Sequence, residues 1–259
     1  MLVAGLLSVA PPSRAAEQGP YPIWWSPSLE LESLDKIDQR LARDLYPGEE
    51  GFRVDVGLGG KRRTVLANDC AELRALERES GGAVTSPDIS LEFIFEENCL
   101  ALETLKRARP ADRSHVRDFA LNAAALAYLP AMVTPGRSCD WMCRLYVANE
   151  RRIPLTEFET GLLRATLKND HEFEIETDLD TTRVEILARA DFNLDGLEDL
   201  LVHVFSKAKE GAWGARELFV MTREAPDAVL RVMDADRYIC DPETYHVCDP
   251  RYDVPPALR

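Results

Sequence analysis

The sequence predicts an α+β fold, in which a helical N-terminal lobe is followed by an antiparallel β-meander that carries a calcium loop. Apolar residues recur at helical intervals as far as about residue 168, and from about Glu172 they alternate with polar residues. An oxygen-rich loop at residues 191–202 lies between two segments rich in β-branched and aliphatic residues, which indicates a strand on each side of it.

We expect four segments along the chain. They are a signal peptide at 1–16, a mainly helical region at 17–168, an antiparallel β region with the calcium-binding loop at 169–236, and a disulfide-ringed C-terminal tail at 237–259. The first ten residues are apolar, and small residues that suit a cleavage site follow them. No Lys or Arg precedes the apolar run, so two interpretations stay open: a signal peptide that lacks its first residues, or an apolar tail.

Helical spacing accounts for most of the first 168 residues. Ser33 is a suitable N-cap, and apolar residues from Leu34 to Leu45 then fall on one face until Pro47 ends the helix. A short strand is expected at 52–56. Further helices are expected at 64–79, 98–108, 114–129, through 141–147, and from Thr156 onward, where a capping box begins.

Alternating residues predict the strands of the second half. The expected strands are 173–176, 184–190, 199–205, 217–222 and 229–233, and short acidic or glycine-bearing turns separate them. Strands at this spacing are typical of a meander.

The loop between the second and third of these strands has the composition of a cation site. Oxygen-bearing side chains occupy positions 1, 3, 5 and 9, and Gly196 at position 6 permits a sharp turn. Calcium takes six to eight oxygen ligands, and a curled loop points alternate side chains inward. The candidate ligands are the side chains of Asp191, Asn193, Asp195 and Asp199 and the backbone carbonyl of Leu197.

The flanking strands distinguish this loop from an EF-hand, which needs two helices and a Glu at position 12, where this chain has Val202. The segment resembles the calcium loop of FG-GAP and VCBS-type repeats, which build integrin-like β-propellers. The resemblance implies Ca²⁺ bound by Asp191, Asn193, Asp195 and Asp199. Those repeats usually have Gly at position 4, where this chain has Leu194. The motif occurs once, whereas a propeller needs several blades.

Charge and hydropathy exclude some classes of partner. The net charge of −14 disfavours nucleic acid and anionic membranes, because both attract basic surfaces. No apolar run after the N-terminus approaches the roughly 20 residues that a transmembrane helix needs.

The six cysteines favour an oxidising compartment, so we expect a periplasmic or secreted protein. None of them forms a CxxC metal motif. Spacing favours a Cys240–Cys248 ring. Cys139 and Cys143 are close enough to pair or to tie to another segment. Once Cys240 is paired with Cys248, the pairings Cys70–Cys99 and Cys139–Cys143 follow mainly by elimination.

No catalytic residue is predicted. The histidines form no zinc-ligand pattern, and neither a GxSxG nor an SxxK motif occurs. Ser114 and His115 are neighbours on an expected helix, which does not make them a nucleophile and base. His203 lies just beyond the loop and could approach the cation. Arg144, Arg151 and Arg152 form a small basic cluster that could receive an anion.

These features predict an exported, calcium-stabilised structural, binding or interaction module with an unknown protein or small-molecule partner. The alternative is an exported hydrolase with an active site between the lobes that no motif reveals. A ring of polar residues in a pocket near His203 would favour the enzyme, and a shallow surface would favour the module.

Overall fold

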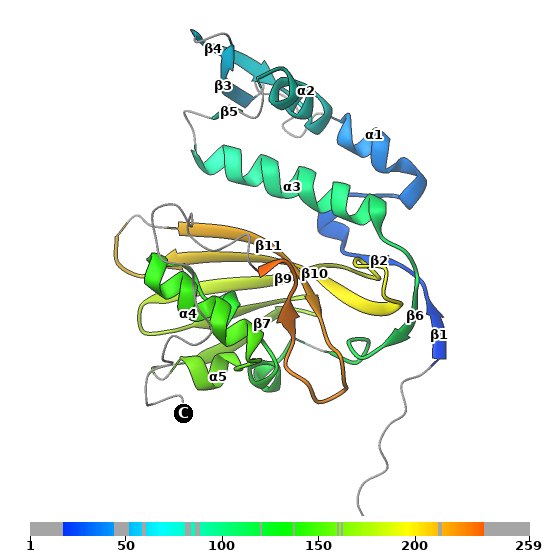
Figure 1. Ribbon diagram of the computed structural model, residues 1–259, viewed down its shortest axis with the longest axis vertical. Coiled ribbons are helices and arrows are strands. Elements are labelled where there is room, and N and C mark those ends of the chain that lie inside the picture. The colour runs from blue at the N-terminus through cyan, green and yellow to red at the C-terminus, as the bar shows by residue number, and fades with distance from the viewer. Residues whose placement is uncertain are drawn as a thin grey trace, which may run out of the picture.

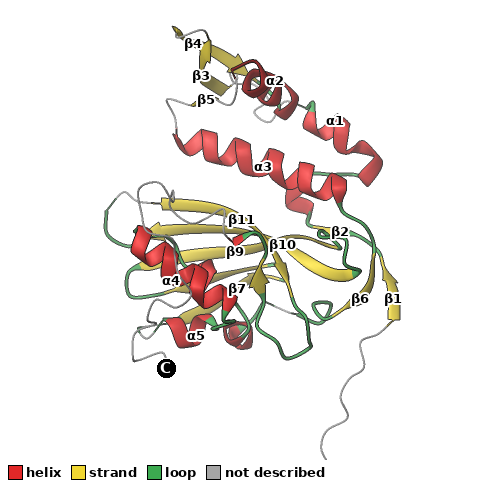
Figure 2. Cartoon of the chain, in the orientation of Figure 1, coloured by secondary structure: helices red, strands yellow, loops and turns green. Residues whose placement is uncertain are grey.

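Two β-sheets and a few helices make up the computed structural model of the protein (Figures 1 and 2). It describes residues 18–43, 52–58, 61–80, 84–85, 89–119, 121–136, 138–159, 161, 163–211 and 214–235. The expected signal peptide and the disulfide-ringed tail lie outside these residues.

The larger sheet has nine strands. They are β1 (Gln18–Tyr21), β2 (Trp24–Trp25), β6 (Ala111–Ser114), β7 (Arg164–Asn169), β8 (Glu172–Glu176), β9 (Asp180–Ala190), β10 (Leu197–Ala208), β11 (Gly214–Thr222) and β12 (Arg231–Val232). Strands β7 to β11 pair antiparallel in chain order. One side of β10 pairs with β6 at its first two residues and with β11 from Leu200 onward, so the sheet curls.

The smaller sheet consists of β3 (Phe52–Leu58), β4 (Lys61–Ala67) and β5 (Val84–Thr85), in the order β4-β3-β5. The α-helices are α1 (Ile37–Leu41), α2 (Cys70–Ser80), α3 (Ile89–Arg107), α4 (Cys139–Glu150) and α5 (Leu155–Phe158). Short 3₁₀ helices span Pro27–Leu29, Leu34–Lys36, Ala123–Ala127 and Ala131–Val133.

Both faces of the central strands are buried. On one face, Ile186 and Val202 pack in a core that includes residues of α4 and α5. On the other face, Leu187 and Leu201 pack against residues of α3. Burial on both faces explains the consecutive apolar residues at 186–188 of β9 and 200–202 of β10.

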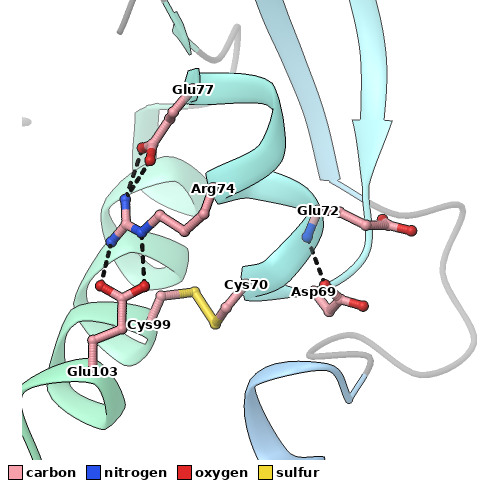
Figure 3. The surroundings of a disulfide bond; sticks show 7 residues. All are labelled: Asp69, Cys70, Glu72, Arg74, Glu77, Cys99 and Glu103. Atoms are coloured by element: carbon pink, nitrogen blue, oxygen red, sulfur yellow. Dashed lines mark hydrogen bonds and ion pairs between the residues drawn. A yellow bond between two sulfur atoms is a disulfide. The ribbon is translucent and has the colours of Figure 1, made fainter. Parts of the chain in front are cut away.

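Helix α3 lies between the two sheets (Figure 1). Leu102 and Leu105 pack toward the larger sheet, whereas Phe95 and Cys99 pack with residues of β3 and α2. A disulfide joins Cys99 to Cys70 at the start of α2. Beside it, Arg74 of α2 pairs with Glu103 of α3 and with Glu77 (Figure 3). The small sheet and α2 are therefore covalently fastened to α3.

The prediction of a helical N-terminal lobe is wrong. Six strands, β1 to β6, lie within residues 17–168, and three of them belong to the larger sheet. Strands β1, β2 and β6 are short and pair with each other or with β9 and β10, far along the sequence. Local spacing carries no signal for such pairing. The helix expected at 64–79 begins only at Cys70, because the residues before it complete the β3–β4 hairpin.

The helix expected at 114–129 is also absent, and β6 leads there into turns and a 3₁₀ helix. Arg189 of β9 donates hydrogen bonds to the carbonyls of Val116, Arg117 and Phe119. The Asn122 side chain then accepts from the amides of the next turn. These contacts satisfy backbone groups that a helix would otherwise pair, so tertiary structure overrides the helical spacing.

The expected Cys70–Cys99 disulfide is confirmed. Cys139 and Cys143, at the start of α4, are also disulfide-bonded. Cys240 and Cys248 lie outside the described residues, so the Cys240–Cys248 ring stays a prediction. No helix in the described ranges is both long enough and apolar enough to span a bilayer.

Candidate functional site

The turn after β9 and the first three residues of β10 form a segment that we call the acidic loop (residues 191–199), and it contains all five predicted calcium ligands. Leu194 has a φ of 67° and Gly196 a φ of 82°. Leu194 therefore adopts the left-handed conformation, which is unfavourable for a residue with a Cβ. Leu194 is 55% exposed, so its side chain makes few packing contacts that could offset this cost. The backbone has the sharp turn that the sequence predicts.

Asp191 holds the loop in this shape. Its Oδ1 accepts hydrogen bonds from the amides of Leu194 at 2.6 Å and Asp195 at 3.2 Å. Its Oδ2 accepts from the amide of Gly196 at 2.9 Å. The residue is buried. These three amide hydrogen bonds fix the turn from Leu194 to Gly196 around the Asp191 carboxylate.

Asp199 is the most deeply buried acid of the loop, with no exposed surface. Its Oδ2 accepts from the amide of Phe192 at 3.1 Å. Burial, with smaller contributions from Asp195 and Asp191, raises the pKa of Asp199 to about 7, although Thr222 and the Phe192 amide oppose this rise. The Thr222 hydroxyl makes no well-aligned hydrogen bond, so Asp199 Oδ1 has no hydrogen-bond partner among the described residues.

The other two predicted side-chain ligands, Asn193 and Asp195, contact each other. Asn193 Nδ2 donates to Asp195 Oδ2 at 2.8 Å, and Asp195 Oδ1 accepts from the amide of Leu197 at 2.7 Å. Within the described part of the chain, no group of three or more His, Cys, Asp or Glu side chains is arranged to hold a metal. The predicted ligands are thus gathered in one loop, but their carboxylates do not converge on one point.

The acidic loop is tied to the segment that follows α3. The backbones of Arg109 and Asp191 exchange two hydrogen bonds, and the amides of Asp112 and Arg113 both donate to the carbonyl of Gly196 at 3.0 Å. Only Ala108 separates the end of α3 from Arg109. The position of the loop is therefore linked through backbone contacts to the position of α3.

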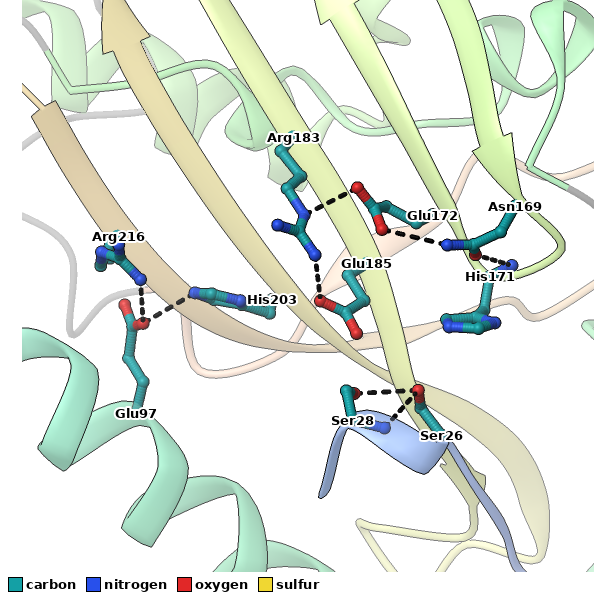
Figure 4. Close-up of polar contacts among 10 residues, drawn as sticks. All are labelled: Ser26, Ser28, Glu97, Asn169, His171, Glu172, Arg183, Glu185, His203 and Arg216. Carbon is teal, nitrogen blue, oxygen red and sulfur yellow. Dashed lines mark hydrogen bonds and ion pairs between the residues drawn. The ribbon is translucent and has the colours of Figure 1, made fainter. Parts of the chain in front are cut away.

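A second candidate site lies between α3 and the larger sheet. It is a cavity of about 180 Å³, which we call the α3 pocket, lined by Ser28, Leu29, Glu97, Asn98, Arg183, Glu185, Leu187, His203 and Arg216. Figure 4 shows its charged residues and Ser28. The strand residues reach it because Arg183, Glu185 and Leu187 alternate along β9, and His203 is paired with Glu185 across β9 and β10. The polar side chains of three neighbouring strands thus share one face.

Glu97 of α3 meets the sheet in this pocket. Its Oε2 lies 2.7 Å from His203 Nε2 and 3.9 Å from Arg216 Nη1. The contact with His203 is close but poorly aligned, so the Glu97 oxygens make no hydrogen bond with described residues. The Arg216 guanidinium lies over the Phe205 ring, 4.3 Å from its centroid.

Arg183 forms the other ion-pair cluster of the pocket. Its Nε lies 2.8 Å from Glu172 Oε1, and its Nη2 donates to Glu185 Oε2 at 3.3 Å. Glu185 is 6% exposed. Its second carboxylate oxygen is directed away from Arg183 (Figure 4).

The sequence singled out His203 but missed its partners. Glu97 follows another acid in the sequence and Glu172 alternates with two more, patterns that are typical of solvated surfaces. The available signal was the alternation of Arg183 and Glu185 with the apolar Val184 and Ile186, since polar residues on one face of a buried strand need partners. The structure places the imidazole of His203 against Glu97 of α3, which no spacing in the sequence reveals.

The other polar residues considered from sequence have structural roles. Ser114 Oγ donates to Glu198 at 2.6 Å and accepts from the amides of the following turn. Burial, helped by Arg113 and Arg223, lowers the pKa of His115. Arg144 lies over the Trp141 ring, and Arg152 pairs with Glu224 at 2.6 Å. Neither a nucleophile–base pair nor an anion site is built from these groups in the described structure.

No protein-family model matches the chain, and neither the curated proteins nor the solved structures give a match.

Proposed function

We propose that the chain is an exported binding module whose larger sheet is stabilised by Ca²⁺ held in the acidic loop. The observation that carries this proposal is Asp199, which is fully buried and has an Oδ1 with no hydrogen-bond partner among the described residues. A buried carboxylate oxygen is costly unless a charge or donor meets it. A cation supplied from solution would meet that need.

The types of ligand suit calcium. Three carboxylates, one side-chain amide and one backbone carbonyl give five oxygen donors, and calcium completes its six to eight ligands with water or bidentate carboxylates. Asp191 can still bind a cation through Oδ2, because this oxygen accepts one amide hydrogen bond and has two lone pairs. Asn193 and Asp195 are hydrogen-bonded to each other in this structure. To bind Ca²⁺, both side chains would have to break this contact and turn toward the ion.

Calcium in the acidic loop would do two things for the fold. It would neutralise Asp191, Asp195 and Asp199, whose charges otherwise repel one another. It would also hold the β9–β10 turn, to which the segment after α3 is hydrogen-bonded through Arg109. Support for export comes from the Cys70–Cys99 disulfide, because disulfides persist in oxidising compartments.

The second candidate function is an exported hydrolase, and the α3 pocket is what favours it. A carboxylate beside an imidazole can orient a general base, and Glu97 lies 2.7 Å from His203. The pocket offers no matching nucleophile: the Ser28 hydroxyl donates to Ser26, at 2.9 Å. Binding is therefore the better-supported role of the pocket.

Titration calorimetry tests the calcium proposal. Chelator-treated protein should bind one Ca²⁺ per chain with a Kd of about 10⁻⁴ to 10⁻³ M, as in extracellular calcium modules, and Mg²⁺ should compete poorly because it demands a tighter octahedron. The Asp195→Ala variant should lose this binding. The matched control is Asp170→Ala, which removes an exposed acid from the β7–β8 turn. A parent protein that releases or absorbs no heat with Ca²⁺ would contradict the proposal.

A further inference from the structure

We propose that the α3 pocket binds a small neutral polyhydroxylated ligand of monosaccharide size. This inference deepens the binding role proposed above, but it does not depend on the acidic loop. It rests on the pairing of charges in the pocket, on the polar atoms that remain to a ligand, and on the size and apolar wall of the cavity.

Each charged group of the pocket already faces an opposite charge. Arg183 lies between Glu172 and Glu185, at 2.8 Å and 3.3 Å. Glu97 lies between His203 and Arg216, at 2.7 Å and 3.9 Å. An ionic ligand would have to displace one of these partners and bring its own charge out of water, which is costly in a partly enclosed site. The pocket therefore disfavours a net charge on its ligand.

The polar groups of the pocket can still form hydrogen bonds with a ligand. Glu185 is 6% exposed, and one of its oxygens is directed away from Arg183 (Figure 4). Arg216 lies over the Phe205 ring and reaches Glu97 only at the long distance of 3.9 Å, so its guanidinium retains N–H donors. Ser28 and Asn98 line the pocket from exposed positions. Hydroxyl groups both donate and accept, so a polyol can satisfy acceptors and donors of this kind together.

The size and wall of the cavity agree with this class of ligand. A volume of about 180 Å³ lies below the range of roughly 300–1,000 Å³ that holds drug-sized molecules. Leu29 and Leu187 provide an apolar wall, on which the C–H face of a sugar ring can pack. The expected ligand is thus a single sugar unit or the terminal unit of a longer glycan.

The test is a binding screen of the full chain against D-glucose, D-galactose, D-mannose and N-acetylglucosamine, followed by saturation-transfer NMR and calorimetry. At least one sugar should bind, whereas leucine (a zwitterion) and acetate (an anion) should not. Binding of leucine or acetate in place of every sugar would overturn the inference, and so would the absence of binding by all the probes.

Variants connect the binding to the pocket. Glu185→Gln and Arg216→Ala should each weaken sugar binding by at least about tenfold, as expected for hydrogen bonds to charged groups. Glu174→Gln is the matched control: Glu174 lies on β8 outside the pocket and pairs with Lys168. Ser28→Trp should fill the pocket from an exposed position and abolish binding while the melting temperature stays near that of the parent. Sugar binding unchanged in Ser28→Trp would overturn the assignment.

Running the screen with Ca²⁺ and with chelator separates the two proposals. If the chain binds a sugar in chelator and does not bind Ca²⁺, the proposal for the α3 pocket is supported and the proposal for calcium in the acidic loop is contradicted. Calcium binding without sugar binding would overturn the inference about the pocket alone.

Discussion

Arg109 and Asp191 exchange two backbone hydrogen bonds, at 3.0 Å and 2.9 Å. Arg109 lies two residues after the end of α3, and Asp191 is the first residue of the acidic loop. The bridge therefore joins the predicted cation site to the helix that covers the α3 pocket. Ordering of the loop by a cation would restrain the C-terminal end of α3 through this bridge.

Asp199→Asn should flatten the pH dependence of stability, measured in chelator. Burial raises the pKa of Asp199 from 3.8 to about 7. A carboxyl group with a raised folded-state pKa stabilises the fold fully below its unfolded-state pKa, and this contribution is lost as pH rises through the folded-state pKa. The parent should thus become less stable relative to the variant between pH 4 and 7, by on the order of 4 kcal/mol.

Urea denaturation of both proteins at several pH values measures this difference. The variant and the parent should differ least near pH 4 and most above pH 7. A constant difference across this range would show that Asp199 is ionised throughout.

Leu194→Gly should stabilise the protein by about 1 kcal/mol, because Leu194 adopts a φ of 67° that glycine tolerates. Its side chain is 55% exposed, so little packing is lost. The opposite change, Gly196→Ala, should destabilise: φ is 82° there, and a Cβ would lie 3.3 Å from Asp112 Oδ2. Chemical denaturation checks both variants, and a less stable Leu194→Gly protein would contradict the reasoning.

Removal of the Cys70–Cys99 disulfide should lower the free energy of unfolding by about 3 to 4 kcal/mol, because it closes a loop of 29 residues. The measurement is urea denaturation of the double variant Cys70→Ala/Cys99→Ala. Arg74 should still hold α2 to α3 through Glu103. A decrease in the free energy of unfolding of less than about 1 kcal/mol would contradict this prediction. It would show that residual structure already constrains the unfolded chain, or that noncovalent contacts dominate the packing of α2 on α3.

The helical geometry of α4 argues against a bond between Cys139 and Cys143, so we replace the Cys240–Cys248 and Cys139–Cys143 pairings expected from sequence and predict that Cys139 and Cys143 bond to Cys240 and Cys248. Both are disulfide-bonded and lie four residues apart on α4. Such positions on a helix have Cβ atoms about 5–6 Å apart, whereas a disulfide needs about 3.5–4.5 Å. Non-reducing peptide mapping decides the connectivity. A Cys240–Cys248 peptide, which the spacing in the sequence favours, would contradict this pairing.

The acidic loop could be found from sequence because its predicted ligands are contiguous. The strands around it were also visible: those expected at 184–190 and 199–205 lie within β9 and β10. The N-terminal fold could not be found in this way. Strand β2 has two residues, and its pairing with Arg189 and Ala188 of β9 depends on the whole chain.

The α3 pocket was hidden for the same reason. Its lining comes from residues as far apart as Ser28 and Arg216. Glu97 and Glu185 appear in the sequence as ordinary members of an acidic chain, and only packing of α3 on the sheet gives them partners. His203 lies against Glu97, which is 106 residues away in the chain, so no sequence motif could pair the two residues.

Calcium-dependent thermal melting tests the central claim most directly. The parent, Asp195→Ala and Asp170→Ala are melted in chelator, in millimolar Mg²⁺ and in millimolar Ca²⁺. Binding to the folded state alone should stabilise the parent and Asp170→Ala by on the order of 1 kcal/mol in Ca²⁺, with little effect of Mg²⁺. Asp195→Ala should show no response to Ca²⁺, and in chelator it should melt no lower than the parent because one repelling charge is gone. A parent melting temperature that is the same in chelator and in Ca²⁺ would contradict the account.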